Sequence, residues 1–489
     1  MEYQSDIWAT KTKIVCTLGP ASTEEPVLRK MIKAGMDVAR LNFSHGTYDE
    51  KRKTFQLLRK IGQEQEIAIM CDIQGPKIRL GKMAKSYELQ TGDQIELTTE
   101  EIDGDAKKVT ISYKTLTQDL HEGDFIFVND GIVKLKVTKV LANSVMCKTI
   151  AGGVISDHKG VNIPTGNLQV EIPTANDKEA LRVIADLKSD YVAASFVGKA
   201  TDVEAVRRVL RNFGEKDAKI ISKIERPVAL KNFDEILRVS DGIMVARGDL
   251  GVEIPPQEVP VAQKEMIRKS NKEGRPVIVA TQMLESMVSQ ARPTRAEAND
   301  VFNAVLDGAD AVMLSGETSV GKYPVEAITI MNEIATRAEK FVKNVPRDPH
   351  LFDSANETIV ETAGHAVQTI AEEFAKLDYD AKILCITTSG FTAQMISKYR
   401  PYYPILAITP DERVAHQLCL NWGVRPLFLK TIEGVAVEEK VLRTVLNAWE
   451  KGYIKETDKV ITVLSSSILT NLGTVVGIYQ VKDFIPKQM

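Results

Sequence analysis

The chain contains few cysteines, and none of them stands close to another. Its 489 residues include five cysteines and no C-x-x-C pair: Cys16, Cys71, Cys147, Cys385 and Cys419. Paired cysteines at short spacings are typical of structural zinc sites and of disulfide-rich secreted domains. Their absence argues against both classes and predicts reduced thiols in a cytoplasmic protein.

The sequence also lacks a long apolar run and an excess of charge of either sign. No stretch reaches the ~18 consecutive apolar residues of a membrane-spanning helix, and the N-terminus lacks the basic and apolar regions of a secretion signal. Lysine and arginine number 63 against 66 aspartates and glutamates, a net charge of −3. Neither nucleic acid nor a membrane is therefore an expected partner, and an anionic ligand would need a local cluster of cations.

What the sequence does contain is a repeated alternation of short apolar runs with amphipathic segments. This alternation predicts β/α units that form a parallel sheet covered by helices. Eight such units favour a closed (β/α)8 barrel, a TIM barrel, over an open sheet. The eight apolar runs are residues 13–17, 37–41, 67–71, 191–195, 219–223, 242–246, 276–280 and 311–315.

Two further regions interrupt or follow this pattern. Residues 76–171 are rich in Val, Ile, Thr and Gly with frequent turn signals, which predicts a small all-β insertion after the third strand. After a proline-containing linker at 344–349, five more apolar runs predict a C-terminal α/β domain with a five-stranded sheet. The expected domains are a barrel at 1–75 and 172–345, the insertion at 76–171, and the C-terminal domain at 346–489.

Two carboxylates directly follow neighbouring strands of the predicted barrel. In a barrel of this kind the functional groups come from the C-terminal ends of the strands. Glu225 and Asp249 occupy such positions and have no histidine or cysteine beside them. An oxygen-only pair favours Mg²⁺ or Mn²⁺ over zinc.

Two cations and a hydroxyl join these carboxylates at the same rim. Lys223 and Arg40 would create a positive field beside the metal, which a transferring phosphoryl group requires. Backbone N–H groups near Gly248 could bind a substrate carboxylate, and Thr281 could place a hydroxyl over it. One such residue alone is more often part of a rim ion pair. Several strands place polar or charged residues at the same rim, and this combination favours phosphoryl transfer.

Five motifs along the chain resemble those of pyruvate kinases, and the resemblance extends from TLGP at 17–20 into the C-terminal domain. It implies transfer of the phosphoryl group of phosphoenolpyruvate to ADP, giving pyruvate and ATP in the last step of glycolysis. It also implies a small β-barrel lid that closes over the barrel and excludes water, and an allosteric C-terminal domain. The motifs are NFSHG at 42–46, ISKIE at 221–225, MVARGDLG at 244–251, ATQML at 280–284 and LSGET at 314–318.

The resemblance implies a role for each matching catalytic residue. Lys223 would stabilise the phosphoryl transition state, and Arg40 would hold the phosphate. Glu225 and Asp249 would bind Mg²⁺ or Mn²⁺, and Thr281 would lie near the protonation step.

Substrate and nucleotide contacts are implied in the same way. The substrate carboxylate would lie on Gly248, Asp249 and Thr281. The ADP or ATP contacts would be Asn42, His45, Arg79 and, from the lid, Lys159.

At the exit of the third strand the sequence departs from the family pattern. Most members bind K⁺ through residues that match Asn42, Ser44, Asp72 and the carbonyl group of Ile73, and they carry glutamate where this chain has Lys77. Because a lysine ammonium group is itself a fixed positive charge, we expect Lys77 to substitute for the cation and activity to be independent of K⁺. The alternative is a lysine at the lid hinge that points into solvent.

A second departure follows the metal-binding motif. Arg226, Pro227, Val228 and Ala229 replace the usual polar residues and glycine. The lysine and the two carboxylates of the motif are unchanged, so we expect the chemistry to survive.

The C-terminal domain contains a segment that resembles the family's effector loop. Thr387, Thr388, Ser389 and Gly390 lie between a predicted strand and helix and could bind a phosphate, or they could merely cap the helix. The partner loop at 465–471 is short and lacks the tryptophan or arginine of some members. AMP or a sugar monophosphate is therefore expected in preference to fructose 1,6-bisphosphate. The family also implies a homotetramer.

Two other functions fit parts of the sequence. Another barrel enzyme that uses phosphoenolpyruvate, such as a mutase or a dikinase fragment, would share the rim residues, but the insertion and the C-terminal domain argue against it. A catalytically inactive metabolite sensor would share the fold. The intact Lys223, Glu225, Asp249 and Thr281 argue against that function.

Overall fold

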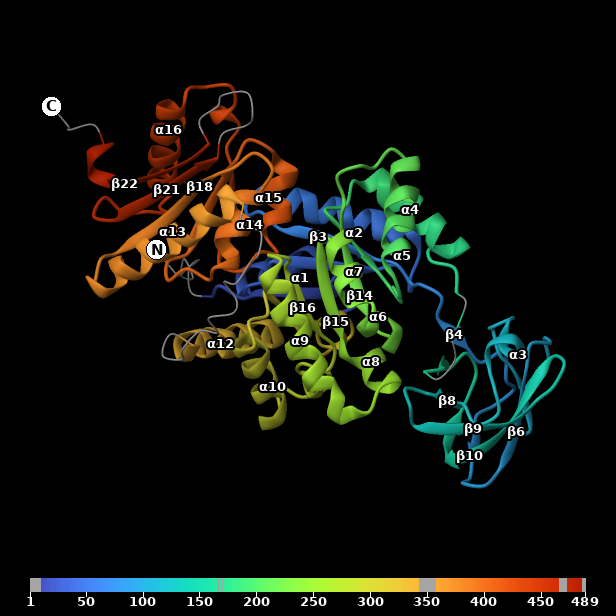
Figure 1. The fold of residues 1–489 in the computed structure, drawn as a ribbon. Helices are drawn as coiled ribbons and strands as arrows, with labels where there is room; N and C mark the ends of the chain where they lie inside the picture. The colour runs from blue at the N-terminus through green and yellow to red at the C-terminus, as the bar shows by residue number, and fades with distance from the viewer. Residues whose placement is uncertain (1–9, 165–167, 169, 343–357, 466–472, 486–489) are drawn as a thin grey trace.

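A central barrel carries one domain at each end. The structure, a computed structural model, describes residues 10–164, 168, 170–342, 358–465 and 473–485. The all-β insertion and the C-terminal domain lie at opposite ends of the barrel (Figure 1). The expected linker at 344–349 lies outside the described residues, and the exact domain limits stay predictions.

The barrel closes with eight parallel strands in the order β1-β17-β16-β15-β14-β13-β3-β2. All eight expected strands are present, which confirms the predicted (β/α)8 fold. They are β1 (Lys13–Leu18), β2 (Val38–Asn42), β3 (Ala68–Asp72), β13 (Tyr191–Ala194), β14 (Lys219–Ile224), β15 (Gly242–Ala246), β16 (Val277–Ala280) and β17 (Ala311–Leu314).

Helices surround the barrel on its outside (Figure 1). Several begin with a capping box that satisfies otherwise unpaired backbone N–H groups, such as Thr47 with Glu50 and Thr294 with Glu297. The helices are α1 (Glu25–Ala34), α2 (Tyr48–Ile61), α4 (Ala175–Leu187), α5 (Ala200–Asn212), α6 (Pro227–Lys231), α7 (Phe233–Val239), α8 (Arg247–Glu253), α9 (Val259–Lys272), α10 (Arg295–Leu306), α11 (Gly316–Ser319) and α12 (Pro324–Val342).

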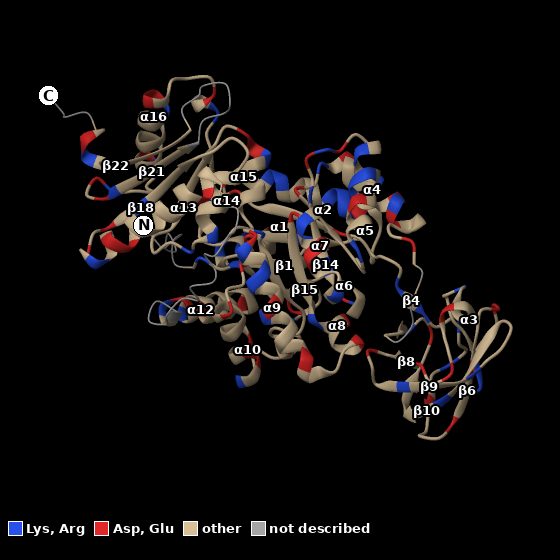
Figure 2. Cartoon of the chain, viewed as in Figure 1, with Lys and Arg blue, Asp and Glu red and all other residues tan. Residues whose placement is uncertain are grey.

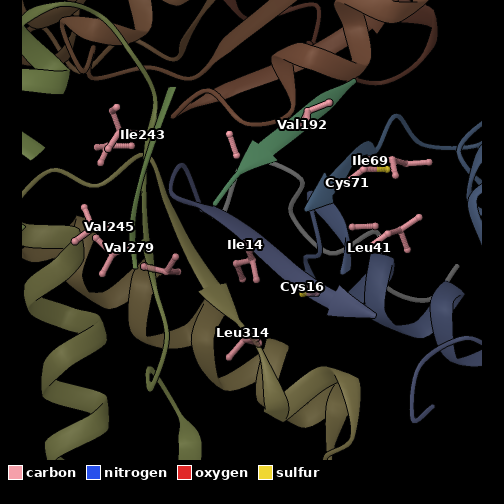
Figure 3. Close-up of a cluster of buried hydrophobic side chains, with 14 of the residues drawn as sticks. Ile14, Cys16, Leu41, Ile69, Cys71, Val192, Ile243, Val245, Val279 and Leu314 are labelled. Atoms are coloured by element: carbon pink, nitrogen blue, oxygen red, sulfur yellow. The ribbon is translucent and has the colours of Figure 1, made fainter. Parts of the chain in front are cut away.

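Two separate apolar cores follow from the alternation of side chains along each barrel strand. Successive residues of a strand point to opposite faces. Ile14 and Cys16 therefore belong to an outer core between strands and helices, to which the labelled side chains of Figure 3 belong. Val15 points the other way. The inner core comprises Val15, Val38, Ala68, Met70, Tyr191, Ala193, Ile221, Met244, Ile278, Ala280, Ala311, Met313, Cys419 and Leu420.

The insertion, here called the lid, leaves the barrel after β3 and returns before α4. Its main sheet has seven strands in the order β4-β12-β8-β9-β10-β6-β7, curled into a half-barrel that does not close, with β11 and β5 paired separately. The elements are β4 (Ile78–Arg79), β5 (Tyr87–Leu89), β6 (Gln94–Thr98), β7 (Lys108–Thr110), α3 (Leu116–Asp119), β8 (Phe125–Val128), β9 (Val133–Val140), β10 (Ser144–Ala151), β11 (Gly153–Ile155) and β12 (Gly160–Asn162).

The C-terminal domain contains the expected five-stranded sheet. Its order is β20-β19-β18-β21-β22, with only the edge strand β22 antiparallel to its neighbour. The elements are α13 (Ile359–Lys376), β18 (Ala381–Ile386), α14 (Phe391–Lys398), β19 (Ile405–Thr409), α15 (Glu412–Leu418), β20 (Val424–Phe428), α16 (Val437–Glu450), β21 (Lys459–Ser465) and β22 (Thr474–Gln480).

The C-terminal domain supplies part of the inner core of the barrel. Cys419 and Leu420, which follow α15, pack with side chains at the N-terminal end of the strands, and Leu420 is fully buried there. Tyr191 of the barrel donates a hydrogen bond to the carbonyl group of Gln417. Arg413 pairs with Glu215 at 3.0 Å. The barrel is therefore closed at this end by another domain.

Charged residues of both signs are interspersed over all three regions, as Figure 2 shows. In the part of the chain that the structure describes, no helix combines the length and the apolar character needed to cross a membrane.

The contact at the closed end of the barrel can be tested with Leu420→Ala. Removing a fully buried leucine should lower the free energy of unfolding by about 2–5 kcal/mol. Leu442→Ala on α16 is the control, because Leu442 is 36% exposed. Urea denaturation of both variants measures the difference, and equal midpoints would contradict the packing role of Leu420.

Candidate active site

The polar residues of the barrel lie at the end opposite to the C-terminal domain. Along β14, Ile221 belongs to the inner core, so Lys223 and then Glu225 point to the same interior side. The same alternation brings Arg40 from β2 and Asp72 from β3 to this side. An apolar layer thus supports a layer of charged groups.

Asp72 is the shared partner of two cations. Its Oδ2 accepts a hydrogen bond from Nε of Arg40 at 2.7 Å, and its Oδ1 lies 3.4 Å from Nζ of Lys223. Burial of Asp72, which is 1% exposed, would raise its pKa. The two cations outweigh this effect, so the pKa of Asp72 lies below its usual value and the carboxylate stays ionised.

Lys223 is held by three acceptors. Its Nζ lies 2.9 Å from Oε1 of Glu225 and donates to Oγ of Ser195 at 2.7 Å, in addition to Asp72. Burial opposes the charged form, but the carboxylates of Asp72 and Glu225 raise the pKa of Lys223 above its usual value. Lys223 is therefore a fixed positive charge in a site that is largely closed to water.

Glu225 and Asp249 form the oxygen pair expected for a divalent cation. Burial raises the pKa of Glu225; Lys223 opposes this, while the charge of Asp249 adds to the rise. Two carboxylates that repel each other in this way suit a cation between them. Among the described residues no three His, Cys, Asp or Glu side chains are grouped as a metal site.

Lys77 lies beside the expected metal site. Its Nζ is 3.7 Å from Oδ1 of Asp249, and its side chain is one-third exposed. On the other side it faces the lid, because a Cβ added at Gly160 would lie 3.5 Å from Cε of Lys77. The lysine therefore points between lid and barrel.

Gly248 and Thr281 contact each other across neighbouring strand ends. The N–H group of Gly248 donates to Oγ1 of Thr281 at 2.7 Å. A Cβ at position 248 would lie 3.4 Å from Thr281, in ordinary van der Waals contact with it. Asp249 follows in the first turn of α8.

The residues expected to contact nucleotide lie along the rim between barrel and lid. Burial lowers the pKa of His45, and the charges of Arg79, Lys51 and Lys77 lower it further. Arg79 of β4 donates to the carbonyl group of His158 at 3.1 Å, next to Lys159. The lowered pKa favours the neutral form of His45, which lies among the cations of this rim.

The remaining predicted residues lie in two places. Oδ1 of Asn42 accepts the N–H group of Ser44 at 3.0 Å, and the carbonyl group of Ile73 accepts a hydrogen bond from Ser195 at 2.7 Å, both at the barrel mouth. The segment Thr387, Thr388, Ser389 and Gly390 precedes α14 in the C-terminal domain and is not part of the barrel site.

Comparison with known proteins identifies the family. Residues 9–328 match the family described as "Pyruvate kinase, barrel domain", and residues 361–476 match "Pyruvate kinase, alpha/beta domain". The pyruvate kinase of Clostridium acetobutylicum is 41% identical over 96% of this chain and 99% of its own length. That of Thermococcus litoralis is 41% identical over 95% of this chain and 97% of its own.

The chain belongs to the pyruvate kinase family. It is therefore a phosphotransferase of a family that uses a divalent metal. The pyruvate kinase of Clostridium perfringens, 43% identical over 85% of this chain and 88% of its own length, agrees with this assignment.

Two residues at the site of this pyruvate kinase family member were missed by sequence reasoning. Ser195 connects Lys223 to the carbonyl group of Ile73, and Oγ1 of Thr17 accepts a hydrogen bond from Arg40 at 2.8 Å. Both residues end or follow a barrel strand on its interior side. The signal that pointed to Lys223 therefore applied equally to them.

A contact between the lid and the barrel was also missed. Nδ2 of Asn162 in β12 donates to Oε1 of Glu253 at the end of α8 at 2.9 Å. Burial raises the pKa of Glu253 to about 7. The hydrogen bond from Asn162 and the charge of Arg226 oppose the shift, while nearby carboxylates add to it.

The pKa of Glu253, raised by burial, predicts a dependence of stability on pH. Between pH ~4.5 and ~7 the folded state holds a proton on Glu253 that the unfolded state releases, so stability falls as pH rises through this window. Glu253→Gln removes the titration. The wild type should lose on the order of 2 kcal/mol more than the variant between pH 5 and pH 8.

Urea denaturation at both pH values measures this difference. Glu88→Gln, which alters an exposed carboxylate of the lid, is the control and should follow the wild type. Parallel pH curves for the wild type and Glu253→Gln would rule out this role for Glu253.

Proposed function

We propose that this chain is an active pyruvate kinase that transfers the phosphoryl group of phosphoenolpyruvate to ADP. The observation that carries the proposal is the placement of Lys223 between Asp72 and Glu225, with Arg40 on the same carboxylate. This arrangement concentrates fixed cations where a phosphoryl group would develop charge.

In the proposed reaction the bond between the enol oxygen and phosphorus breaks while a bond from an ADP phosphate oxygen forms. Arg40 holds the phosphate, and Lys223 stabilises its transition state. Gly248, Asp249 and Thr281 hold the substrate carboxylate. The enolate left behind then takes a proton at its methylene carbon near Thr281, giving pyruvate.

Glu225 and Asp249 would hold the divalent cation, Mg²⁺ or Mn²⁺. When bound, such a cation neutralises charge on phosphate oxygens. The nucleotide would lie along Asn42, His45, Arg79 and Lys159, where the lowered pKa of His45 reflects burial and surrounding cations. Closure of the lid would exclude water from the phosphoryl group.

Lys223→Met tests the proposal. Loss of the ammonium group should lower the rate of pyruvate formation from phosphoenolpyruvate, ADP and Mg²⁺ by roughly 10²–10³-fold. Lys219→Met is the matched control, because Lys219 lies on the same side of β14 at the opposite end of the barrel. A Lys223→Met enzyme as fast as the wild type would remove Lys223 from the mechanism. No pyruvate from the wild type would favour the inactive sensor.

We further propose that catalysis is independent of K⁺. The position of Lys77 near Asp249 supports the view that its ammonium group replaces the cation, in preference to pointing into solvent.

Omission of K⁺ tests this second proposal. Addition of K⁺ to a K⁺-free assay should change the wild-type rate less than about twofold, since the positive charge is supplied by the protein. Lys77→Glu should be strongly activated by K⁺, and Lys82→Glu, which alters an exposed lid lysine, should behave as the wild type. A several-fold increase of the wild-type rate on adding K⁺ contradicts the proposal.

We also propose that the loop of Thr387, Thr388, Ser389 and Gly390 binds a phosphorylated effector such as AMP or a sugar monophosphate. Oγ1 of Thr387 accepts the N–H group of Gly390 at 3.0 Å, and the hydroxyls of Thr388 and Ser389 are exposed before α14. Nearly all of the partner loop at 465–471 lies outside the described residues.

We propose a cytoplasmic homotetramer as the working form. The open edge of β22 exposes Val475, Ile478 and Tyr479, and an edge strand with apolar side chains favours association of subunits. The five cysteines are free and buried, which suits a reducing compartment.

A further inference from the structure

Arg247, at the start of α8, binds the exit of the neighbouring strand β16. Its Nη2 donates to the carbonyl group of Thr281 at 2.8 Å, and its Nε donates to that of Ala280 at 3.3 Å. Nη2 also lies 2.7 Å from Sδ of Met283. The guanidinium group thus contacts the last residue of β16, Ala280, and two of the residues that follow it, Thr281 and Met283.

The side chain of Arg247 is itself held in place from the other side. Its Nη1 pairs with Oδ1 of Asp300 on α10 at 2.7 Å and lies 3.4 Å from Oε1 of Gln263 on α9. Only 11% of the arginine side chain is exposed. The five donors of a guanidinium group lie on three nitrogens in a fixed plane and can hold a carboxylate and two carbonyl groups that lie apart, whereas the three donors of a lysine share a single nitrogen.

The backbone that Arg247 binds has an unusual conformation. Thr281 and Gln282 have φ angles of 70° and 54°, in the left-handed region. A β-branched residue such as threonine rarely adopts this conformation, which costs energy and persists only where its surroundings impose it. Arg247 holds the carbonyl group of Thr281, and Gly248 holds its hydroxyl group.

We propose that Arg247 is a positioning residue that fixes Thr281 and Gly248 relative to each other. Both residues proposed to bind the substrate carboxylate are positioned by Arg247. Gly248 is the next residue in the chain, and the carbonyl group of Thr281 accepts a hydrogen bond from Arg247. The inference rests on the proposed role of Gly248 and Thr281 in binding that carboxylate.

Kinetics of Arg247→Met and Arg247→Lys test the proposal. Because a displacement of about 1 Å can cost 10²-fold, kcat/KM for phosphoenolpyruvate should fall roughly 10²-fold in Arg247→Met and about tenfold in Arg247→Lys. Most of the loss should lie in KM for phosphoenolpyruvate, while KM for ADP changes less than about twofold, since the nucleotide is expected at the rim between barrel and lid.

Arg207→Met is the matched control. Arg207 likewise joins a carboxylate to a carbonyl group, those of Asp241 and Val239, both at 2.9 Å, but at the N-terminal end of β15. Loss of a merely structural arginine should lower the thermal midpoint and leave KM for both substrates unchanged. Arg207→Met should behave in this way.

An Arg247→Met enzyme that folds and keeps the wild-type KM for phosphoenolpyruvate overturns the proposal. If that variant does not fold, Arg247→Lys and Asp300→Asn decide: a threefold or larger increase of this KM in both supports the proposal, and any other result overturns it. Thr281→Val distinguishes the proposed role of Thr281 in substrate binding from the positioning role of Arg247. Full activity of Thr281→Val would refute the role of Thr281 itself, whereas its loss together with an unchanged Arg247→Met would refute only the positioning.

Discussion

Two buried cations at the mouth of the barrel depend on one carboxylate. Arg40 and Lys223 come from β2 and β14, and Asp72 at the end of β3 contacts both. Without Asp72 the two positive charges would repel each other in a region of low dielectric constant, and breaking such a buried pair typically costs 3–5 kcal/mol. The geometry of the whole cationic layer follows from this shared contact.

The two ends of the barrel have opposite physical characters, and this difference assigns them different tasks. At the N-terminal end, Cys419 and Leu420 of the C-terminal domain complete an apolar core. At the C-terminal end, Lys223 and Glu225 continue the same interior face with charged groups. The packed end supplies stability, and this stability supports buried charges that would be costly by themselves.

The mouth of the barrel combines a local concentration of charge with local backbone strain. The net charge is only −3, yet three cations lie at one end of the barrel. Each pairs with a carboxylate there: Arg40 with Asp72, Lys77 with Asp249 and Lys223 with Glu225. The left-handed Thr281 stores conformational energy beside them. Neighbouring strand ends hold both features: Asp72 contacts Lys223, and Arg247 contacts the carbonyl group of Thr281.

The pattern of apolar runs in the sequence was sufficient to predict the eight strands of the barrel and the five-stranded C-terminal sheet. Strands buried on both faces leave continuous apolar runs that can be recognised. It also placed Lys223 and Glu225 on one side, since residues two apart in a strand share a face. The motifs around these residues further indicated the family.

Contacts between distant segments were decided only by the tertiary structure. Asn162 and Glu253 are separated by 91 positions, and Arg247 and Thr281 by 34. Periodicity determines the face on which a side chain lies. It does not determine how far neighbouring strands are staggered or how the lid is oriented, and these two quantities decide which polar groups meet.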